Sequence, residues 1–182
     1  MLLNASDCGL VVVDLQARLV PALADPEVVV RRARLLLQAA ARLDVPVLAT
    51  EQSPASIGHT VESVAAALPS GAVVEKTAFA ATREARFQER AAALDRPRLV
   101  VCGAEAHVCV LQTALGLIEA GYAVAIAADA AGSRRMEDRE LALARLRDAG
   151  ADVVTSEMVV FEWLQRAGTD AFRALIPLIK DD

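Results

Sequence analysis

The chain has 182 residues, a formal net charge of −5 and a hydrophobic fraction of 55%. This length suits one compact domain with its own core, so we expect residues 1–182 to form a single domain. Basic and acidic residues are interleaved, which argues against the one-sided basic face that a nucleic-acid-binding protein needs. We therefore expect a small-molecule substrate and no nucleic-acid partner.

The apolar runs are too short to span a membrane, because acidic residues such as Asp14 and Asp129 interrupt them. The amino-terminal segment has no basic region and no small-residue cleavage site, so we expect no signal peptide and a cytoplasmic location. The three cysteines, Cys8, Cys102 and Cys109, form neither a C-x-x-C motif nor a Cys/His cluster. We expect no disulfide framework, no zinc site and no cofactor.

Short valine-rich runs alternate with amphipathic segments along the chain. Strands are expected at residues 10–13, 47–50, 72–74, 98–102, 123–127 and 152–154, and helices at residues 26–43, 61–68, 82–94, 106–120, 136–149, 157–166 and 169–178. The strand runs are continuous rather than alternating, which is typical of strands covered on both faces. This order predicts an α/β fold of three layers, with a doubly wound, mostly parallel sheet between two layers of helices. The longest irregular piece expected is residues 51–59.

In such sheets ligands bind beyond the carboxyl ends of the strands, and three reactive side chains fall there. Asp14 follows the first strand, Lys76 follows the third, and Cys109 lies in the first turn of the helix after the fourth. Each residue alone has an ordinary explanation: a turn cap, a solvated lysine and a buried thiol. Together they supply a nucleophile, a proton acceptor and a nearby cation, as a cysteine hydrolase requires.

Stabilising the thiolate is the demanding step, because lowering a thiol pKa from ~8.5 to ~7 requires about 2 kcal/mol. A helix N-terminus contributes only ~0.3–1 kcal/mol, whereas an ammonium at ~4 Å could contribute up to ~4 kcal/mol. We therefore expect Lys76 to lower the pKa of Cys109 and Asp14 to carry the thiol proton to the leaving group. Backbone amides around Glu105 and Cys109 are expected to form an oxyanion hole.

These residues lie in motifs that resemble the isochorismatase-like cysteine hydrolase superfamily, which includes nicotinamidases and N-carbamoylsarcosine amidases. The resemblance covers nearly the whole chain, through VVVDLQ, EKTAF, GAEAHVCVLQT, ADAAGSR and GADVVTSE, and EQSPASIGHTV points to the isochorismatase domain-containing group. It implies a triad of Asp14, Lys76 and Cys109, a six-stranded sheet of order 3-2-1-4-5-6, and a homo-oligomer (dimer or tetramer). It also implies a non-proline cis peptide between Ala104 and Glu105 that aims an amide into the oxyanion hole.

Two departures from the family narrow the expected activity. Nicotinamidases carry an Asp-x-His pair and a further His as metal ligands after the second strand, whereas this chain has Glu51, Gln52 and Ser53 there and His59 alone. Metal binding is therefore not expected. Siderophore-type members that cleave isochorismate lack the nucleophilic cysteine, so Cys109 favours hydrolysis of a C–N or another acyl-type bond, most simply an amide cleaved through a covalent thioester.

The remaining assignments concern the substrate pocket and a second histidine. Gln16, Gln52 and Phe79 are expected to bind the substrate. His107 lies two residues before the nucleophile on a helical turn, where the two side chains do not face each other, so we expect helix-end hydrogen bonding or an oligomer contact. Two other functions stay open: a non-catalytic member of this fold that binds a small ligand or a protein, and hydrolysis of isochorismate or another vinyl ether.

Overall fold

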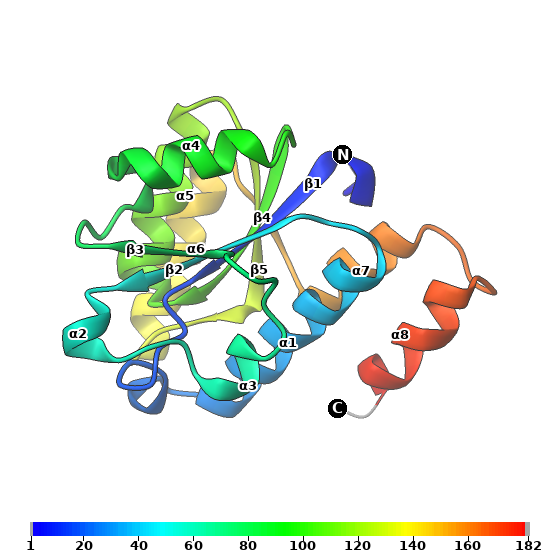
Figure 1. Ribbon diagram of the computed structural model, residues 1–182, viewed down its shortest axis with the longest axis horizontal. Helices are drawn as coiled ribbons and strands as arrows, with labels where there is room; N and C mark the ends of the chain where they lie inside the picture. Colours follow the sequence, from blue (N-terminus) through cyan, green and yellow to red (C-terminus); the bar gives the residue numbers. More distant parts are fainter. Residues whose placement is uncertain (1, 181–182) are drawn as a thin grey trace.

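Figure 1 shows the computed structural model of the protein, which describes residues 2–180. Within these residues the strands form one six-stranded sheet of order β3-β2-β1-β4-β5-β6, and every neighbouring pair is parallel. The strands are β1 (Cys8–Val13), β2 (Val47–Gln52), β3 (Val73–Lys76), β4 (Arg98–Ala104), β5 (Ala123–Gly132) and β6 (Asp152–Val154). The expected α/β class and the strand order implied by the resemblance are both confirmed.

The helices connect successive strands and add two at the carboxyl terminus. They are α1 (Pro26–Arg42), α2 (Pro54–Ile57), α3 (Glu62–Ala65), α4 (Ala85–Ala93), α5 (Leu111–Glu119), α6 (Met136–Asp148), α7 (Ser156–Leu164) and α8 (Asp170–Lys180). Short 3-10 turns lie at η1 (Ala5–Asp7), η2 (Val20–Ala22) and η3 (Ala81–Arg83), and a π-helical turn, η4 (Ala106–Val110), precedes α5. No helix within residues 2–180 is both long and apolar enough to cross a membrane.

The segment expected to be irregular is partly regular. β2 continues through Gln52, and residues 54–57 form α2, because Pro54 suits the first turn of a helix and Gly58, with φ of +86°, ends it. The helix expected at 61–68 is shorter, since only Glu62–Ala65 is helical. These changes move Gln52 from a loop onto the sheet.

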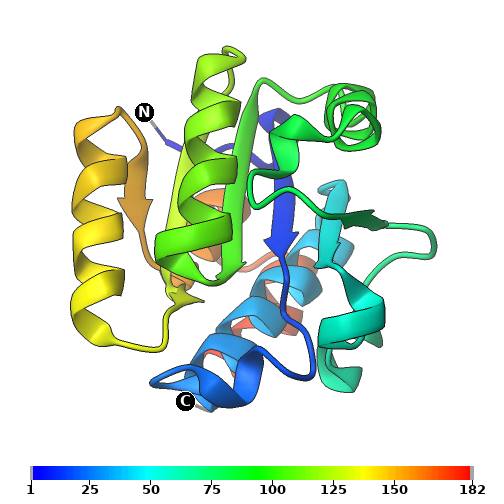
Figure 2. The same cartoon turned by 90° about the vertical axis from the view of Figure 1, so that its left-hand side faces the viewer.

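Alternate residues of β1 explain the three layers. Leu10 and Val12 pack into a core shared with α1, α7 and α8, whereas Val11 and Val13 pack on the opposite face with α4, α5 and α6. Figure 2 shows helices on both faces of the sheet. Burying a valine or leucine side chain contributes about 1.5–3 kcal/mol, so a strand with both faces covered is held firmly. That strand is the base on which the site is built.

A glycine at the end of β4 lets the two central strands approach closely. Gly103 is in register with Val13, has φ of +124°, and leaves no space for a Cβ, which would collide with the Val13 carbonyl. Only glycine fits this combination of close approach and positive φ. The residues that follow the two strands, Asp14 and the turn containing Cys109, are thereby brought to the same edge of the sheet.

Candidate active site

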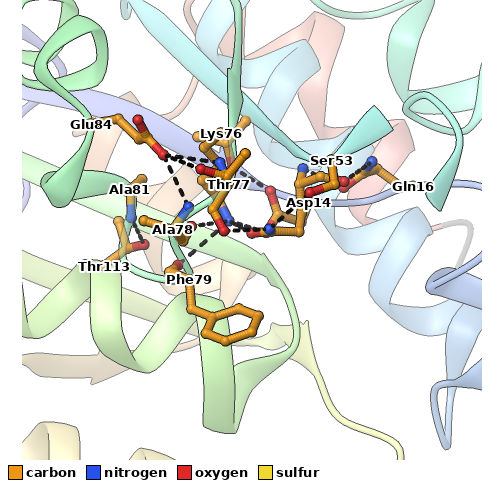
Figure 3. Close-up of polar contacts among 12 residues, drawn as sticks. Asp14, Gln16, Ser53, Lys76, Thr77, Ala78, Phe79, Ala81, Glu84 and Thr113 are labelled. Carbon is orange, nitrogen blue, oxygen red and sulfur yellow. Dashed lines mark hydrogen bonds and ion pairs between the residues drawn. The ribbon is translucent and has the colours of Figure 1, made fainter. Parts of the chain in front are cut away.

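Asp14 and Lys76 form a buried ion pair at the carboxyl ends of β1 and β3. Lys76 Nζ lies 2.7 Å from Asp14 Oδ2, and neither side chain is exposed to solvent. Asp14 has φ of +48°, in the left-handed region that aspartate tolerates better than most residues. Figure 3 shows the contact between the two side chains. The structure thus brings together two residues that are 62 positions apart in the sequence.

Further oxygen atoms surround the pair. Lys76 Nζ donates to Gln52 Oε1 at 2.6 Å and to the carbonyls of Ala78 and Phe79 at 3.2 and 3.4 Å. On the other partner, the Thr50 hydroxyl donates to Asp14 Oδ1 at 2.7 Å. A buried ion pair offsets its desolvation only when such additional hydrogen bonds satisfy both charges. The pair is therefore one part of a polar network that spans three strands.

Cys109 lies against this pair, on the turn η4, with only 5% of its surface exposed. Burial raises the pKa of the thiol to about 12; the neighbouring Asp14 carboxylate also raises this pKa, and Lys76 offsets only part of the rise. The expected lowering of the thiol pKa is therefore wrong. The physical reason is that burial disfavours the charged thiolate and the Asp14 charge adds to this, so the opposite effect of Lys76, which has the expected direction, is outweighed.

One oxygen of Asp14 is suited to receive a proton. Asp14 Oδ2 is buried and lies 2.7 Å from the Lys76 ammonium, and the Asp14 carboxylate is within hydrogen-bond reach of the Cys109 thiol. Asp14 Oδ1, in contrast, accepts from Thr50. A carboxylate oxygen beside a neutral thiol is the arrangement that general-base removal of the thiol proton requires.

The turn before Cys109 contains the implied cis peptide, between Ala104 and Glu105. The Glu105 carbonyl accepts hydrogen bonds from the amides of Val108 and Val110 at 3.0 and 3.1 Å. The Glu105 carboxylate lies 2.9 Å from Arg134 Nε. Backbone amides at the start of a helix lack partners in the preceding turn. This turn therefore offers backbone donors close to Cys109.

The three expected substrate-binding residues have different surroundings. Gln16 is fully buried, and its amide bonds the backbone of Gln52 in both directions and the carbonyl of Gly58. These bonds hold the end of β2, and the expected substrate contact of Gln16 stays a prediction. Gln52 is buried and is committed to Lys76 and to the carbonyl of Thr77. Phe79 is 55% exposed and is the one of the three that a substrate can reach.

The two histidines lie apart from the buried pair. His59 is exposed and its Nδ1 lies 2.9 Å from Glu51 Oε2, while the other oxygen of Glu51 accepts from the amide and hydroxyl of Thr60. His107 Nδ1 lies 2.9 Å from Ser133 Oγ, just after β5, so this hydrogen-bond partner is a side chain of another segment rather than the end of its own helix. Within residues 2–180, no group of three or more His, Cys, Asp or Glu side chains is arranged to hold a metal ion.

A cavity of about 630 Å³ adjoins the carboxyl end of β3. Its lining comes from the segment after β2, the end of β3 and the start of α4: Ser53, Pro54, Ala55, His59, Glu75, Lys76, Thr77 and Glu84. A second cavity of equal volume lies between α4 and α5 and is lined by neither Lys76 nor Asp14, whereas the first cavity reaches the pair through Lys76; Cys109 lines neither cavity. The first cavity is therefore the space that adjoins the ion pair.

Sequence reasoning missed Thr50 and Glu84 as contributors to the site, and it assigned Gln52 to the substrate rather than to Lys76. Thr50 and Gln52 hold the charged pair from β2, and the Glu84 carboxylate binds the turn after Lys76. Thr50 had a usable signal, because it ends the expected second strand beside the first. The contacts of Glu84 had none, since they depend on how α4 folds back toward β3.

The fold and the site define an α/β protein of doubly wound topology, with a buried Asp-Lys pair and a cysteine at the carboxyl edge of its sheet. This is a hydrolase fold. The chain belongs to the isochorismatase family, because the family model for the isochorismatase domain matches residues 8–158.

Similar proteins agree with this assignment. Isochorismatase domain-containing protein 2 of Macaca fascicularis is 39% identical over 160 residues, which cover 86% of this chain and 74% of that protein. The Xenopus laevis protein of the same name is 37% identical over 156 residues, covering 86% and 75%. A solved structure described as a MAR1 ribonuclease from Caenorhabditis elegans has a TM-score of 0.92 at 30% identity, covering 98% and 92%.

A more distant structure supports the fold alone. The YcaC gene product of Escherichia coli, described as an octameric hydrolase of unknown specificity, has a TM-score of 0.94 at 24% identity and covers 100% of this chain and 92% of its own. The implied isochorismatase-like fold and the relation to the isochorismatase domain-containing group are thus confirmed.

Proposed function

We propose that this protein is a metal-independent cysteine hydrolase that cleaves a C–N bond of a small amide through a thioester on Cys109. The observation that carries the proposal is the contact of the Cys109 thiol with a buried Asp14–Lys76 pair whose Asp14 Oδ2 can still accept a proton. Asp14, Lys76 and Cys109 form the proposed catalytic triad. Membership of the isochorismatase family supports a hydrolase.

The high thiol pKa sets the order of events. Because the resting thiol is neutral, its proton passes to Asp14 as the sulfur attacks the substrate carbonyl. The tetrahedral intermediate then collapses, the C–N bond breaks, and Asp14 returns the proton to the departing nitrogen. A water molecule next attacks the thioester with Asp14 as its base, which releases a carboxylic acid and restores the thiol.

Lys76 and the backbone stabilise the charges that develop during these steps. As Asp14 becomes protonated, the Lys76 ammonium loses its counter-charge and is free to stabilise the sulfur anion. The amides of Glu105 and Cys109 are the proposed oxyanion hole for the carbonyl oxygen. A missing oxyanion donor typically costs about 10²–10³ in rate.

Ammonia release from a panel of small primary amides tests the proposal. Wild-type protein should hydrolyse at least one amide, and Cys109→Ala and Asp14→Asn should reduce its rate by more than about 10³-fold, as for other catalytic units. Glu89→Gln, an exposed glutamate on α4, is the matched control that should keep full activity. Undiminished hydrolysis by Cys109→Ala would contradict the thioester.

The name of the Caenorhabditis elegans neighbour raises a second reaction, cleavage of RNA. The interleaved charges of this chain and its net charge of −5 favour a small substrate instead. RNA should therefore stay intact under conditions that release ammonia from an amide. Cleavage of RNA that Cys109→Ala abolishes would reassign the substrate while keeping the nucleophile.

We also propose that residues 1–182 form a single domain, that the protein assembles as a homodimer or homotetramer, and that it is cytoplasmic. The octameric description of the Escherichia coli neighbour makes assembly worth measuring here. Light scattering coupled to size-exclusion chromatography should give a mass of two or four chains. A monomer at micromolar concentration would contradict the assembly.

A further inference from the structure

The turn of residues 77–79 supplies two of the oxygen atoms around Lys76. The carbonyls of Ala78 and Phe79 accept from Lys76 Nζ at 3.2 and 3.4 Å. A lysine that ends a strand would normally extend into solvent, yet this side chain is fully buried. The position of the ammonium therefore depends on the position of this turn.

One carboxylate oxygen accepts hydrogen bonds from two backbone amides of the same turn. Glu84 Oε1 accepts from the backbone amides of Thr77 and Ala78 at 2.9 and 3.0 Å, and from the Thr77 hydroxyl at 3.3 Å. Figure 3 shows Glu84 on the side of the turn away from Asp14. The amides point to Glu84 while the carbonyls of Ala78 and Phe79 bind Lys76. Glu84 thus fixes the orientation of the peptide units that hold the ammonium.

Glu84 occupies the N-cap position of α4 but does not cap that helix, because its side chain accepts no hydrogen bond from the helix. Its carboxylate is directed back to the preceding turn. A polar residue at the start of a helix usually accepts hydrogen bonds from the first amides of that helix, and Glu84 does not.

Two further contacts tie the turn to the rest of the site. Gln52 Nε2 donates to the carbonyl of Thr77 at 2.8 Å. At the other end, the amide of Ala81 donates to Thr113 Oγ1 at 3.0 Å, and Thr113 lies on α5, directly after the turn of Cys109. The segment from Lys76 to Ala81 is therefore held between β2, α4 and the nucleophile helix.

We infer that Glu84 is a positioning residue for Lys76, acting through the turn of residues 77–79 that binds the ammonium. Its meaning for catalysis rests on the proposed function, in which Lys76 stabilises the Cys109 sulfur anion. Glu84 itself touches neither the thiol nor the carboxylate of Asp14 in the contacts described above. Its effect is to keep the ammonium in one place.

The lysine content of the chain makes a direct test possible. There are two lysines, Lys76 and the exposed Lys180, so side-chain ¹⁵N spectra of the ammonium groups contain two signals at most. In Glu84→Ala, the Lys76 ammonium protons should exchange with water roughly three- to tenfold faster, the factor that corresponds to weakening one hydrogen bond. Glu84→Gln keeps an acceptor oxygen, so its Lys76 exchange rate should lie between those of wild type and Glu84→Ala.

Arg90→Ala is the matched control, because Arg90 lies on the same helix and donates to a loop carbonyl, that of Gly71, away from Lys76. It should leave Lys76 exchange at the wild-type rate. The backbone amide of Val11 in β1 reports global opening and should not change in any variant. Unchanged Lys76 exchange in both Glu84 variants would overturn the inference, as would equal acceleration at Lys76 and Val11.

This readout does not depend on the reactivity of Cys109. If wild-type protein forms no acyl-enzyme but Glu84→Ala still frees Lys76, the proposed function fails and the positioning role stands. If Cys109 is acylated normally but the Lys76 exchange rate is the same in wild type and the Glu84 variants, the positioning role alone fails.

Discussion

Two pairs of opposite charges lie at the carboxyl edge of the sheet, and they differ in surroundings more than in distance. Asp14 and Lys76 are 2.7 Å apart with both side chains fully buried. Glu51 and His59 are 2.9 Å apart, but 78% of the His59 side chain is exposed. Exposed pairs contribute about 0–1 kcal/mol, whereas breaking a buried pair leaves an uncompensated charge. Burial, rather than distance, separates the two pairs.

The hydrogen bonds around each pair follow the same division. The buried pair has partners on both charges, through Thr50 and Gln52. In the second pair only His59 is exposed, since Glu51 is 5% exposed. Two of the hydrogen bonds to Glu51 come from Thr60, and the exposed His59 side chain adds one more. The first arrangement suits chemistry, because its charges are fixed and desolvated. The second suits a structural link between β2 and the following loop.

Lys76→Met should have the largest effect on stability. It leaves the Asp14 carboxylate buried without its cation, which costs about 3–5 kcal/mol in the free energy of unfolding. Urea denaturation followed by circular dichroism measures this change. The double variant Asp14→Asn/Lys76→Met has no buried charge at this position and should recover part of the loss. If it recovers nothing, charge pairing is not what stabilises the site.

Alkylation of Cys109 by iodoacetamide should depend steeply on pH. Because burial raises the thiol pKa to about 12, the thiolate fraction and the rate should rise about tenfold per pH unit from pH 7 to 9. Peptide mapping by mass spectrometry gives the rate for Cys109. A rate that reaches a plateau near pH 7 would mean that Lys76 does stabilise a resting thiolate, and the mechanism would start from the anion.

Glu51→Gln should cost less than Lys76→Met, about 1–3 kcal/mol, because the amide cannot accept both bonds from Thr60 and the one from His59. Burial alone would raise the pKa of Glu51, but the bonds from Thr60 and His59 outweigh it and lower the pKa. The loss of stability in Glu51→Gln should therefore be present above pH 4.5, the ordinary pKa of a glutamate. It should shrink as the pH falls through the lower pKa that Glu51 has in the folded protein. A pH-independent loss would point to packing.

His59→Gln should have the smallest effect on stability. The hydrogen bond with Glu51 raises the pKa of His59 above 6.5 in the folded protein. Its contribution is therefore fully present below pH 6.5 and disappears as the pH rises through the raised value. Melting temperatures of wild type and variant should differ slightly at pH 5.5 and coincide at pH 9. A large difference at pH 9 would show that His59 has a role beyond this pair.

The strand order was predictable because the sequence motifs resemble those of a family with this order. The continuous apolar runs indicated where each buried strand lies. The edges of elements were less so. β5 continues to Gly132, past its expected end at residue 127, because residues beyond Asp129 still pair with the end of β4. Local composition does not reveal where a neighbouring strand stops offering hydrogen bonds.

The proximity of Asp14, Lys76 and Cys109 was also predictable, since strand ends in a parallel sheet meet at one edge. The electrostatics were not. The spacing of Lys76 and Cys109 says nothing of the Asp14 charge between them or of how deeply the thiol is buried, and those two factors decide its pKa. The backbone contacts of Gln16 were not predictable either: its Nε2 donates to the carbonyls of Gln52 and Gly58, and its Oε1 accepts from the amide of Gln52.

The most direct test of a nucleophilic Cys109 uses p-nitrophenyl acetate, an activated ester that acylates cysteine nucleophiles. Rapid mixing should show a burst of nitrophenolate close to one equivalent per chain, and acid quenching followed by peptide mapping should place the acetyl group on Cys109 in wild type and on no residue in Cys109→Ala. A missing burst, or an acetyl group on Cys8 or Cys102 instead, would contradict the account.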